Sequence, residues 1–265
     1  MEETHRDIEQ GNKSVYAEKG DVTVNNYGAD GKKINKHLGI LPPLPTLFIG
    51  RNESLQKVHD LLFSGENVLL LVNGEGGIGK TTFAAKYYHT FLNEYQHAAW
   101  VFAENSIRDA LLTLATALHL DLKNMTDDER LQELLRTLGG LQKPCLLVLD
   151  NANSFDDLTI HYNKLLGCSN FHVLLTTRVT ELAGATIEKI EPLKRDDAIK
   201  LFAKYYTSYK EAEQELLLTL FDAVGYNTLV IELLAKNLAV VNRHKQSYSV
   251  SNLLSDLQQK GVLAL

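Results

Sequence analysis

The stretch NGEGGIGKTT, Asn73 to Thr82, decides the fold of this chain. From Gly74 to Thr81 it matches the pattern G-x-x-x-x-G-K-[ST] at every fixed position. The apolar run before it (67–74) predicts a buried strand, and the residues after it predict a helix to about Phe91. Glycines let a backbone curl so that successive N–H groups and a helix N-terminus face an anion. The stretch therefore predicts a loop that binds the phosphates of a nucleotide.

The polar groups of this loop are expected to have separate roles. Lys80 should contact the β- and γ-phosphates, Thr81 should bind Mg²⁺ through its hydroxyl, and Thr82 should help to hold the α-phosphate. Backbone N–H groups are expected to contact phosphate at the other loop positions: Gly74, Gly76, Gly77, Ile78 and Gly79.

Short apolar runs alternate with amphipathic segments from residue 67 onward, which is typical of a parallel sheet covered on both faces. Helices are expected after Asn52 and over Ser106–Leu120 and Thr126–Leu138. Five strands are expected, at 67–74, 97–104, 144–150, 171–178 and 185–193. The pattern predicts an α/β fold, a three-layer P-loop NTPase sandwich with a parallel five-stranded sheet.

After Pro192 the pattern is purely helical, and it predicts a small helical subdomain. Three segments follow from these shifts of pattern: an N-terminal arm (1–40), a nucleotide-binding domain with its extended entry strap (41–193), and the helical subdomain (194–265).

Two further residues stand where strands of the predicted sheet end. The run KPCLLVLD ends in Asp150, about 70 residues after the loop, where a carboxylate could hold Mg²⁺ through water. The run HVLLTTR ends in Arg178, at the sheet edge where a γ-phosphate would lie. Lys80, Asp150 and Arg178 are the residues expected to act in any chemistry, with Thr81 and Asp150 as the metal site.

Composition limits the other possibilities. The 265 residues carry a formal net charge of −6 and no long run of Lys or Arg, which argues against nucleic-acid binding. Cys145 and Cys168 lack metal-ligand spacing and are expected to be reduced thiols. No apolar stretch approaches the ~20 residues of a membrane span, and a cytoplasmic protein is expected.

The N-terminal arm holds two short alternating runs, at 14–17 and 21–24, separated by turn residues. A small hairpin or a disordered leader fits this composition. A polymerising, amyloid-like assembly motif is the alternative.

Taken together, these motifs resemble the NB-ARC domain of the STAND class of signal-transducing P-loop ATPases. The signatures LFIGRNE, GEGGIGKTT, LLVLDNA and HVLLTTR occur in order, and GYNTL near residue 228 resembles the family's Gly-x-Pro-Leu motif. The resemblance implies that Arg178 contacts the γ-phosphate. It also implies contacts to the base of ATP or ADP from the strap and the helical subdomain, at Ile49, Gly50, Arg51, Thr228 and Leu229.

The resemblance further implies a switch between an ADP-bound closed state and an ATP-bound state that self-associates, with an unidentified trigger and downstream effector, in immune or antiphage-like defence. The family's winged-helix and repeat segments are not among these 265 residues, and a truncated chain or a natural short form would both account for this. An efficient P-loop ATPase or kinase, or a STAND-type transcriptional regulator, are the alternatives.

This chain departs from the family pattern at two positions. Thr228 stands where the family has proline, so its contact with the base would be looser or would involve a hydrogen bond. Asn151 follows Asp150 where many relatives have a second acid, and an amide cannot accept a proton from water. ATP hydrolysis is therefore expected to be slow. Asp156 and Asp157 are expected to lie in a solvated loop, from which either could replace the missing acid.

Overall fold

The computed structural model describes residues 8–10, 13–18, 21–26, 31–65, 68–72, 75–244 and 248–260. The chain divides into two compact units, each of which contains several separate segments. We call them the α/β unit (1–46, 55–74 and 81–189) and the helical unit (47–54, 75–80 and 190–265).

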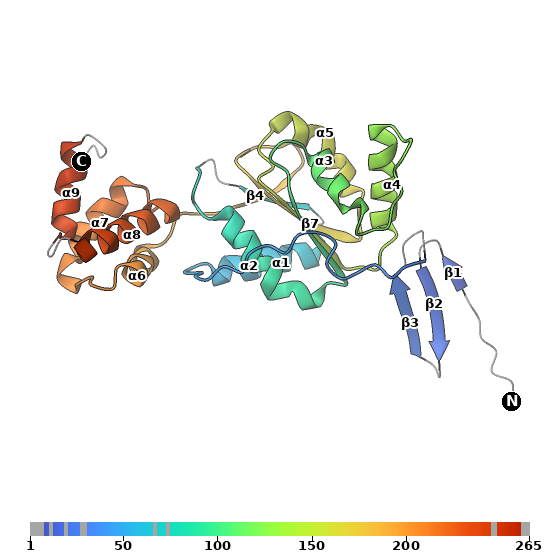
Figure 1. Cartoon of the computed structure of the whole chain (residues 1–265), viewed down its shortest axis with the longest axis horizontal. Coiled ribbons are helices and arrows are strands. Elements are labelled where there is room, and N and C mark those ends of the chain that lie inside the picture. The colour runs from blue at the N-terminus through green and yellow to red at the C-terminus, as the bar shows by residue number, and fades with distance from the viewer. Residues whose placement is uncertain are drawn as a thin grey trace. The chain divides into compact units, whose positions relative to one another are not determined.

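The α/β unit contains the five-stranded sheet, in the order β5-β6-β7-β4-β8, with every neighbouring pair parallel (Figure 1). Its strands are β4 (Val68–Val72), β5 (His97–Phe102), β6 (Cys145–Asp150), β7 (Phe171–Thr177) and β8 (Thr186–Lys189). β5 and β6 are buried on both faces over most of their length, as their continuous apolar sequences require. The predicted parallel sheet is confirmed.

Helices cover both faces of this sheet. On one face Ala99, Leu147 and Val173 belong to a core that includes residues of α3, α4 and α5. On the other face Trp100 is buried against Tyr88 of α2, with ring centroids 6.3 Å apart. Figure 1 shows α1 and α2 on one side of the sheet and α3, α4 and α5 on the other. The helices are α1 (Asn52–Ser64), α2 (Lys80–Phe91), α3 (Ile107–Leu112), α4 (Asp127–Gly139) and α5 (Phe155–Leu166), with short 3-10 turns η1 (Leu92–Glu94) and η2 (Thr113–Ala115).

Helix α5 occupies the segment in which a loop was expected, so that expectation was wrong. Ser154 caps the helix, since its hydroxyl accepts the N–H of Asp157. Asp156 and Asp157 lie in the first turn, where carboxylates are favoured by the helix dipole.

Helix α3 ends earlier than the segment Ser106–Leu120 predicted. Its last turn is followed by the 3-10 turn η2, and the hydroxyl of Thr113 donates to the carbonyl of Ala110 at 2.6 Å. Such a side-chain bond competes with the regular helical pattern.

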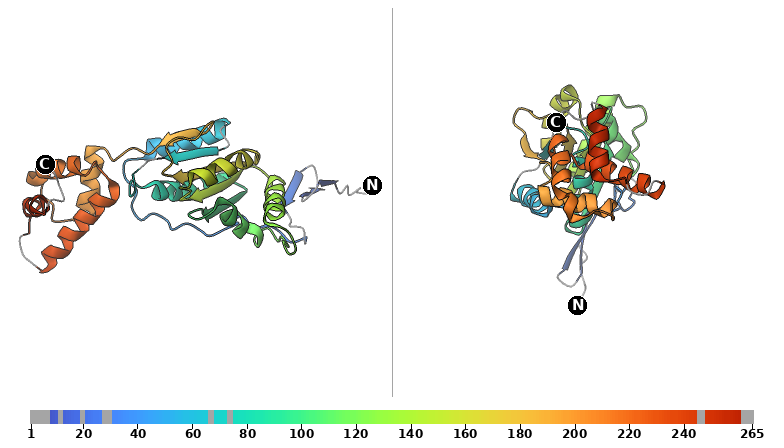
Figure 2. Two further views of the ribbon diagram at one scale, coloured as in Figure 1. Left: turned by 90° about the horizontal axis from the view of Figure 1, so that it is seen from above. Right: turned by 90° about the vertical axis from the view of Figure 1, so that its left-hand side faces the viewer.

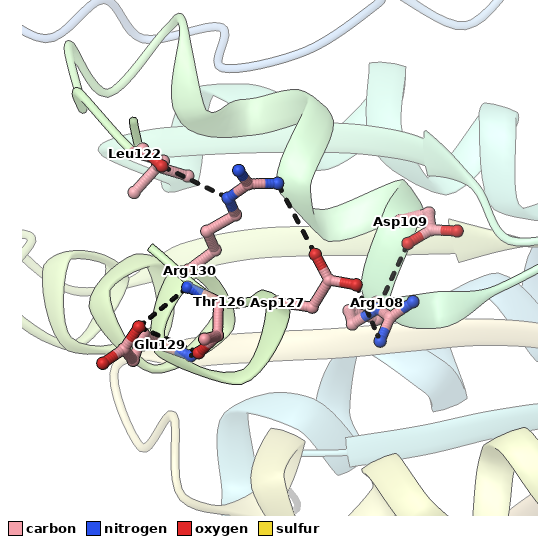
Figure 3. Close-up of polar contacts among 7 residues, drawn as sticks. All are labelled: Arg108, Asp109, Leu122, Thr126, Asp127, Glu129 and Arg130. Atoms are coloured by element: carbon pink, nitrogen blue, oxygen red, sulfur yellow. Dashed lines mark hydrogen bonds and ion pairs between the residues drawn. The ribbon is translucent and has the colours of Figure 1, made fainter. Parts of the chain in front are cut away.

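Polar side chains stabilise the start of α4 and join it to α3 (Figure 3). Thr126 and Glu129 form a capping box, and the backbone N–H of Thr126 donates to the Glu129 carboxylate at 2.7 Å. Asp127 lies between Arg108 of α3, at 3.6 Å, and Arg130, at 3.5 Å. These ion pairs are partly exposed, so each contributes little to stability, and the network chiefly fixes the orientation of the two helices.

The segment before the strap covers the edge strand β5. The N–H of Leu38 donates to the carbonyl of Ala98 at 2.9 Å, and the N–H of Ala98 donates to the carbonyl of Lys36 at 2.7 Å. His37 and Ala98 form a parallel bridge. This edge of the sheet is thereby protected from pairing with another chain.

After Pro192 the described residues of the helical unit form four α-helices, in the segment where the sequence predicted a small helical subdomain. They are α6 (Arg195–Tyr205), α7 (Gln214–Ala223), α8 (Thr228–His244) and α9 (Val250–Gln259), with a 3-10 turn η3 (Glu211–Glu213) before α7 (Figure 2). Phe202, Phe221 and Ile231 are fully buried at the centre of this unit. Leu47 and Ile49 of the strap pack against the same core.

The N-terminal segment forms a separate three-stranded antiparallel sheet, in the order β1-β2-β3. Its strands are β1 (Ile8–Gln10), β2 (Lys13–Glu18) and β3 (Asp21–Asn26). The two alternating runs of the sequence correspond to β2 and β3, which pair along their full length.

Candidate functional site

The phosphate loop, Glu75–Lys80, adopts a conformation that requires glycine at two positions. Gly77 has φ 78° and Gly79 has φ 103°, in the region that side chains other than glycine rarely adopt. A Cβ on Gly77 would lie 2.8 Å from the Cβ of Leu229. The Lys80 ammonium donates to the carbonyl of Glu75 at 3.1 Å, across the loop. Gly74, the first residue of the motif, lies outside the described residues.

The N-terminal turn of α8 donates hydrogen bonds to three consecutive carbonyls of the loop. The side-chain amide of Asn227 donates to Gly76 at 2.8 Å. The hydroxyl of Thr228 donates to Ile78 at 3.0 Å, and the N–H of Leu229 donates to Gly77 at 3.0 Å. Asn227 also caps α8, because its side-chain oxygen accepts the N–H of Leu229 at 3.1 Å.

These bonds orient the loop for an anion. In a trans peptide the C=O and the following N–H point in opposite directions. Because the carbonyls of residues 76–78 point at α8, the N–H groups of Gly77, Ile78 and Gly79 point away from it. Consecutive N–H groups with a common direction form the concave donor array that binds phosphate.

Arg51 joins the strap to the loop and to α8. Its guanidinium donates to the carbonyl of Glu191 at 3.1 Å and to the Thr228 hydroxyl at 3.3 Å. A Cβ on Gly79 would lie 2.7 Å from Nη1 of Arg51, so a side chain at this position would require the guanidinium to move. Burial lowers the pKa of Arg51 from its ordinary value, although the group remains a cation at neutral pH. Gly50 and Ile49 precede it in the strap, and Ile49 packs against the helical core.

In the α/β unit, Asp150 is buried at the end of β6 and two hydroxyls donate to the same carboxylate oxygen, Oδ1. Thr81 donates at 2.8 Å and Thr176 of β7 donates at 2.6 Å. Carboxylate and hydroxyl oxygens are hard ligands of the kind that Mg²⁺ prefers. The two residues predicted as the metal site, Thr81 and Asp150, are therefore in direct contact and fit that ion. Thr82 is exposed in the next position of α2.

Asn151 and Arg178 lie at the same edge of the sheet. Asn151 has φ 68°, a left-handed conformation that asparagine tolerates better than most residues. Arg178 is exposed, and its backbone N–H donates to the side-chain oxygen of Asn153 at 2.8 Å.

Asp157 makes two interactions within the α/β unit. It accepts the N–H of Ile107 at 2.6 Å and lies 3.3 Å from His161. It therefore satisfies the first N–H of α3, whose N-cap is Ser106.

The predicted binding residues divide between the two units. The loop from Gly76 to Lys80, the strap residues and the start of α8 belong to the helical unit, whereas Thr81, Asp150 and Arg178 belong to the α/β unit.

Three polar residues in these clusters were not singled out from the sequence: Asn153, Thr176 and Asn227. Thr176 lies inside the TTR motif, so its position was a usable signal, and Asn227 precedes a predicted helix as a cap does.

Within the described part of the chain, no helix combines the length and the apolar character that crossing a bilayer requires. No group of three or more His, Cys, Asp or Glu side chains in those residues could hold a metal ion. A metal site there would therefore depend on hydroxyl and phosphate oxygens besides Asp150.

Known structures share this fold. A STAND protein with a tetratricopeptide repeat sensor from Pyrococcus horikoshii aligns with a TM-score of 0.53 and 17% identity, over 85% of this chain and 34% of that one. The Orc1 protein of Aeropyrum pernix, solved in complex with DNA, aligns with a TM-score of 0.53 and 16% identity, over 77% of this chain and 63% of that one. At these identities the likeness is one of fold alone.

Sequence comparisons identify the relatives. A disease resistance protein of Arabidopsis thaliana is 25% identical over 198 residues, which cover 69% of this chain and 23% of that protein. The ToMV resistance protein Tm-2(2) of Solanum lycopersicum is 22% identical over 138 residues, 49% of this chain and 16% of that protein. This chain thus spans less than a quarter of the length of either relative. The family model described as NB-ARC domain matches residues 51–212, from the end of the strap through the sheet and α6 to the 3-10 turn η3. The chain belongs to the NB-ARC family of P-loop ATPases.

Proposed function

We propose that this chain is a nucleotide-gated switch that binds ATP or ADP with Mg²⁺ and couples the identity of the nucleotide to signalling in defence. Gly74, Gly76, Gly77, Ile78 and Gly79 would contact the phosphates through backbone N–H groups, together with Lys80 and Thr82. Ile49, Gly50, Arg51, Thr228 and Leu229 would surround the base. Thr81 and Asp150 would hold Mg²⁺, which neutralises phosphate charge when bound.

One observation carries the proposal: the hydrogen bond of 2.8 Å between the Thr81 hydroxyl and the Asp150 carboxylate. It joins the last residue of the phosphate motif to an acid 69 positions later in the chain. A buried carboxylate needs donors, and here one of them is the threonine to which the phosphate motif assigns the Mg²⁺ contact.

A switch requires a ligand that the two states bind with different affinity. A γ-phosphate in contact with Arg178 would supply this difference, because ADP lacks the group that the arginine would bind. Within the helical unit, the hydrogen bonds from Asn227, Thr228 and Leu229 to the loop carbonyls would pass a change in the loop to α8.

Hydrolysis is proposed to be slow. Asn151 cannot accept a proton from water, and its side-chain oxygen already accepts a bond from Asn153. Asp157, one of the two acids that could replace it, instead accepts the N–H of Ile107 in α3. A long-lived ATP state suits a signal better than it suits a motor.

The defence role rests on the relatives, which are named as disease resistance proteins. We propose that the ATP-bound state self-associates and that a trigger and an effector act on it in the cytoplasm. The chain spans 23% of the length of the first of these relatives, so their whole-protein partners are carried over here only as a proposal.

The test is to purify the chain without added nucleotide, extract what is bound and identify it by mass. Wild-type protein should retain ADP or ATP in about one copy per chain, as a slowly exchanging site requires. Lys80→Ala should weaken binding of Mg·ADP at least about tenfold, from loss of a charge-assisted contact. Lys204→Ala, which removes an exposed lysine from the helical unit, is the matched control.

Size-exclusion chromatography with and without a non-hydrolysable ATP analogue then tests assembly. A shift to larger species only with the analogue supports the switch. The proposal would be refuted if the wild-type protein purified without nucleotide and bound neither ADP nor ATP at millimolar concentration.

A further inference from the structure

The segments that follow β6 and β7 are joined by side-chain hydrogen bonds at the edge where Asp150 lies. The Thr176 hydroxyl donates to Asp150 at 2.6 Å and accepts the N–H of Asn151 at 2.8 Å. The N–H of Ala152 then donates to the carbonyl of Thr176 at 2.9 Å. The chain after β6 is therefore bound to the end of β7 at two successive residues.

Asn153 extends this series to the arginine. Its amide nitrogen donates to the side-chain oxygen of Asn151, and its own side-chain oxygen accepts the backbone N–H of Arg178 at 2.8 Å. An asparagine amide carries a donor and an acceptor on one planar group, so it can bind both partners at once. The N–H of Val179 is also held, by the Thr177 hydroxyl at 3.0 Å. The backbone on both sides of the Arg178 carbonyl is thereby anchored.

We propose that Asn153 is a positioning residue, which couples Arg178 to Asp150 through the amide relay Asn151–Asn153. The inference rests on the proposed function, because it assumes that Arg178 binds the γ-phosphate. Asn153 does not touch the nucleotide in this scheme. It fixes the main chain from which the long, exposed arginine side chain extends, so that fewer conformations compete with the one that contacts phosphate.

The relay predicts a selective effect. The α- and β-phosphates are assigned to the loop Glu75–Lys80, which belongs to the helical unit, whereas Asn153 belongs to the α/β unit, so ADP affinity should not depend on this residue. ATP affinity should, because only ATP has the group that Arg178 would contact. A merely structural role for Asn153 would instead lower both affinities together.

The test compares the dissociation constants of ADP and of a non-hydrolysable ATP analogue, each with Mg²⁺, by titration calorimetry on the nucleotide-free full chain. Asn153→Ala should raise the ratio of the ATP-analogue constant to the ADP constant by about fivefold, the loss expected for one or two hydrogen bonds. Asn151→Gly deletes the other end of the relay and tolerates φ 68°, so it should change the ratio in the same direction. Arg178→Ala should change it at least about tenfold.

Asn163→Ala is the matched control, since it removes an exposed asparagine from α5 of the same unit. Equal weakening of ADP and the ATP analogue by Asn153→Ala, or no change in either, would overturn the relay. Failure of Arg178→Ala to change the ratio would overturn both the role of Arg178 and the relay, although nucleotide binding would stand. Wild-type protein that binds neither ligand would overturn the proposed function itself, and the inference with it.

Discussion

The contact between α8 and the phosphate loop can be tested at Thr228. Thr228→Val keeps the size and branching of the side chain and removes only the hydroxyl. That hydroxyl donates to the Ile78 carbonyl at 3.0 Å and accepts from Arg51 at 3.3 Å. The first bond is neutral, while the second is charge-assisted but long and half-exposed, and Arg51 keeps its bond to Glu191. Each should contribute about 1 kcal/mol, so Thr228→Val should lower the free energy of unfolding by about 2 kcal/mol.

Thr228→Pro provides a second, distinguishable outcome. It removes the same two hydrogen bonds, but proline is favoured at the first position of a helix, where its missing N–H has no intrahelical partner. Proline also restricts the unfolded chain, which stabilises the fold by about 0.4–1 kcal/mol. Thr228→Pro should therefore be less destabilised than Thr228→Val.

The assay is urea unfolding followed by far-UV circular dichroism. Thr219→Val is the matched control, because its hydroxyl donates only to Glu215 within α7 of the same unit. Comparable denaturant slopes among the variants would allow their midpoints to be compared as stabilities. A Thr228→Val midpoint no lower than that of Thr219→Val would refute the argument that the Thr228 hydroxyl holds the loop.

Two further predictions concern the α/β unit. Burial, with a smaller contribution from the charge of His59, lowers the pKa of His172 to about 4, below the unfolded value of about 6.5. The free energy of unfolding should thus be highest above about pH 6.5 and fall by on the order of 2 kcal/mol as the pH is lowered to 4. In urea unfolding measured over this pH range, His172→Gln should show a smaller loss. Asn151→Asp places a possible base beside Asp150 and should raise the rate of phosphate release from ATP at least about tenfold. An unchanged rate, equal to that of the control Asn163→Asp, would show that a missing base does not limit turnover.

Local patterns were sufficient to predict the sheet and the loop. Strands β5 and β6 are apolar runs of ordinary length, and the phosphate loop is a contiguous motif in which Gly77 and Gly79 have the positive φ angles that such a turn needs. Helix α5 was missed because two of the residues on its buried face, His161 and Tyr162, carry polar groups. The apolar residues Leu158 and Leu165 alone do not show the helical spacing clearly.

The partners of the site residues were harder to predict, because they lie far apart in the sequence. The Asn227 side chain bonds to Gly76, 151 positions away, and nothing near either residue indicates the other. Asn153 and Arg178 are 25 positions apart and meet only because β6 and β7 are neighbours in the sheet. Strand order is a property of the whole fold, so the amide relay could not be predicted from the motifs alone.

The grouping of the loop Glu75–Lys80 with the helical segments has a consequence for chimeras between relatives. The chain leaves and re-enters the α/β unit at the strap and again at the loop before it continues into α6. A graft that exchanges only the residues after 190 would bring in a foreign α8 and leave the native loop behind. Such a hybrid should work best when strap, loop and helices are transplanted as one set, even though they are three separate pieces of sequence.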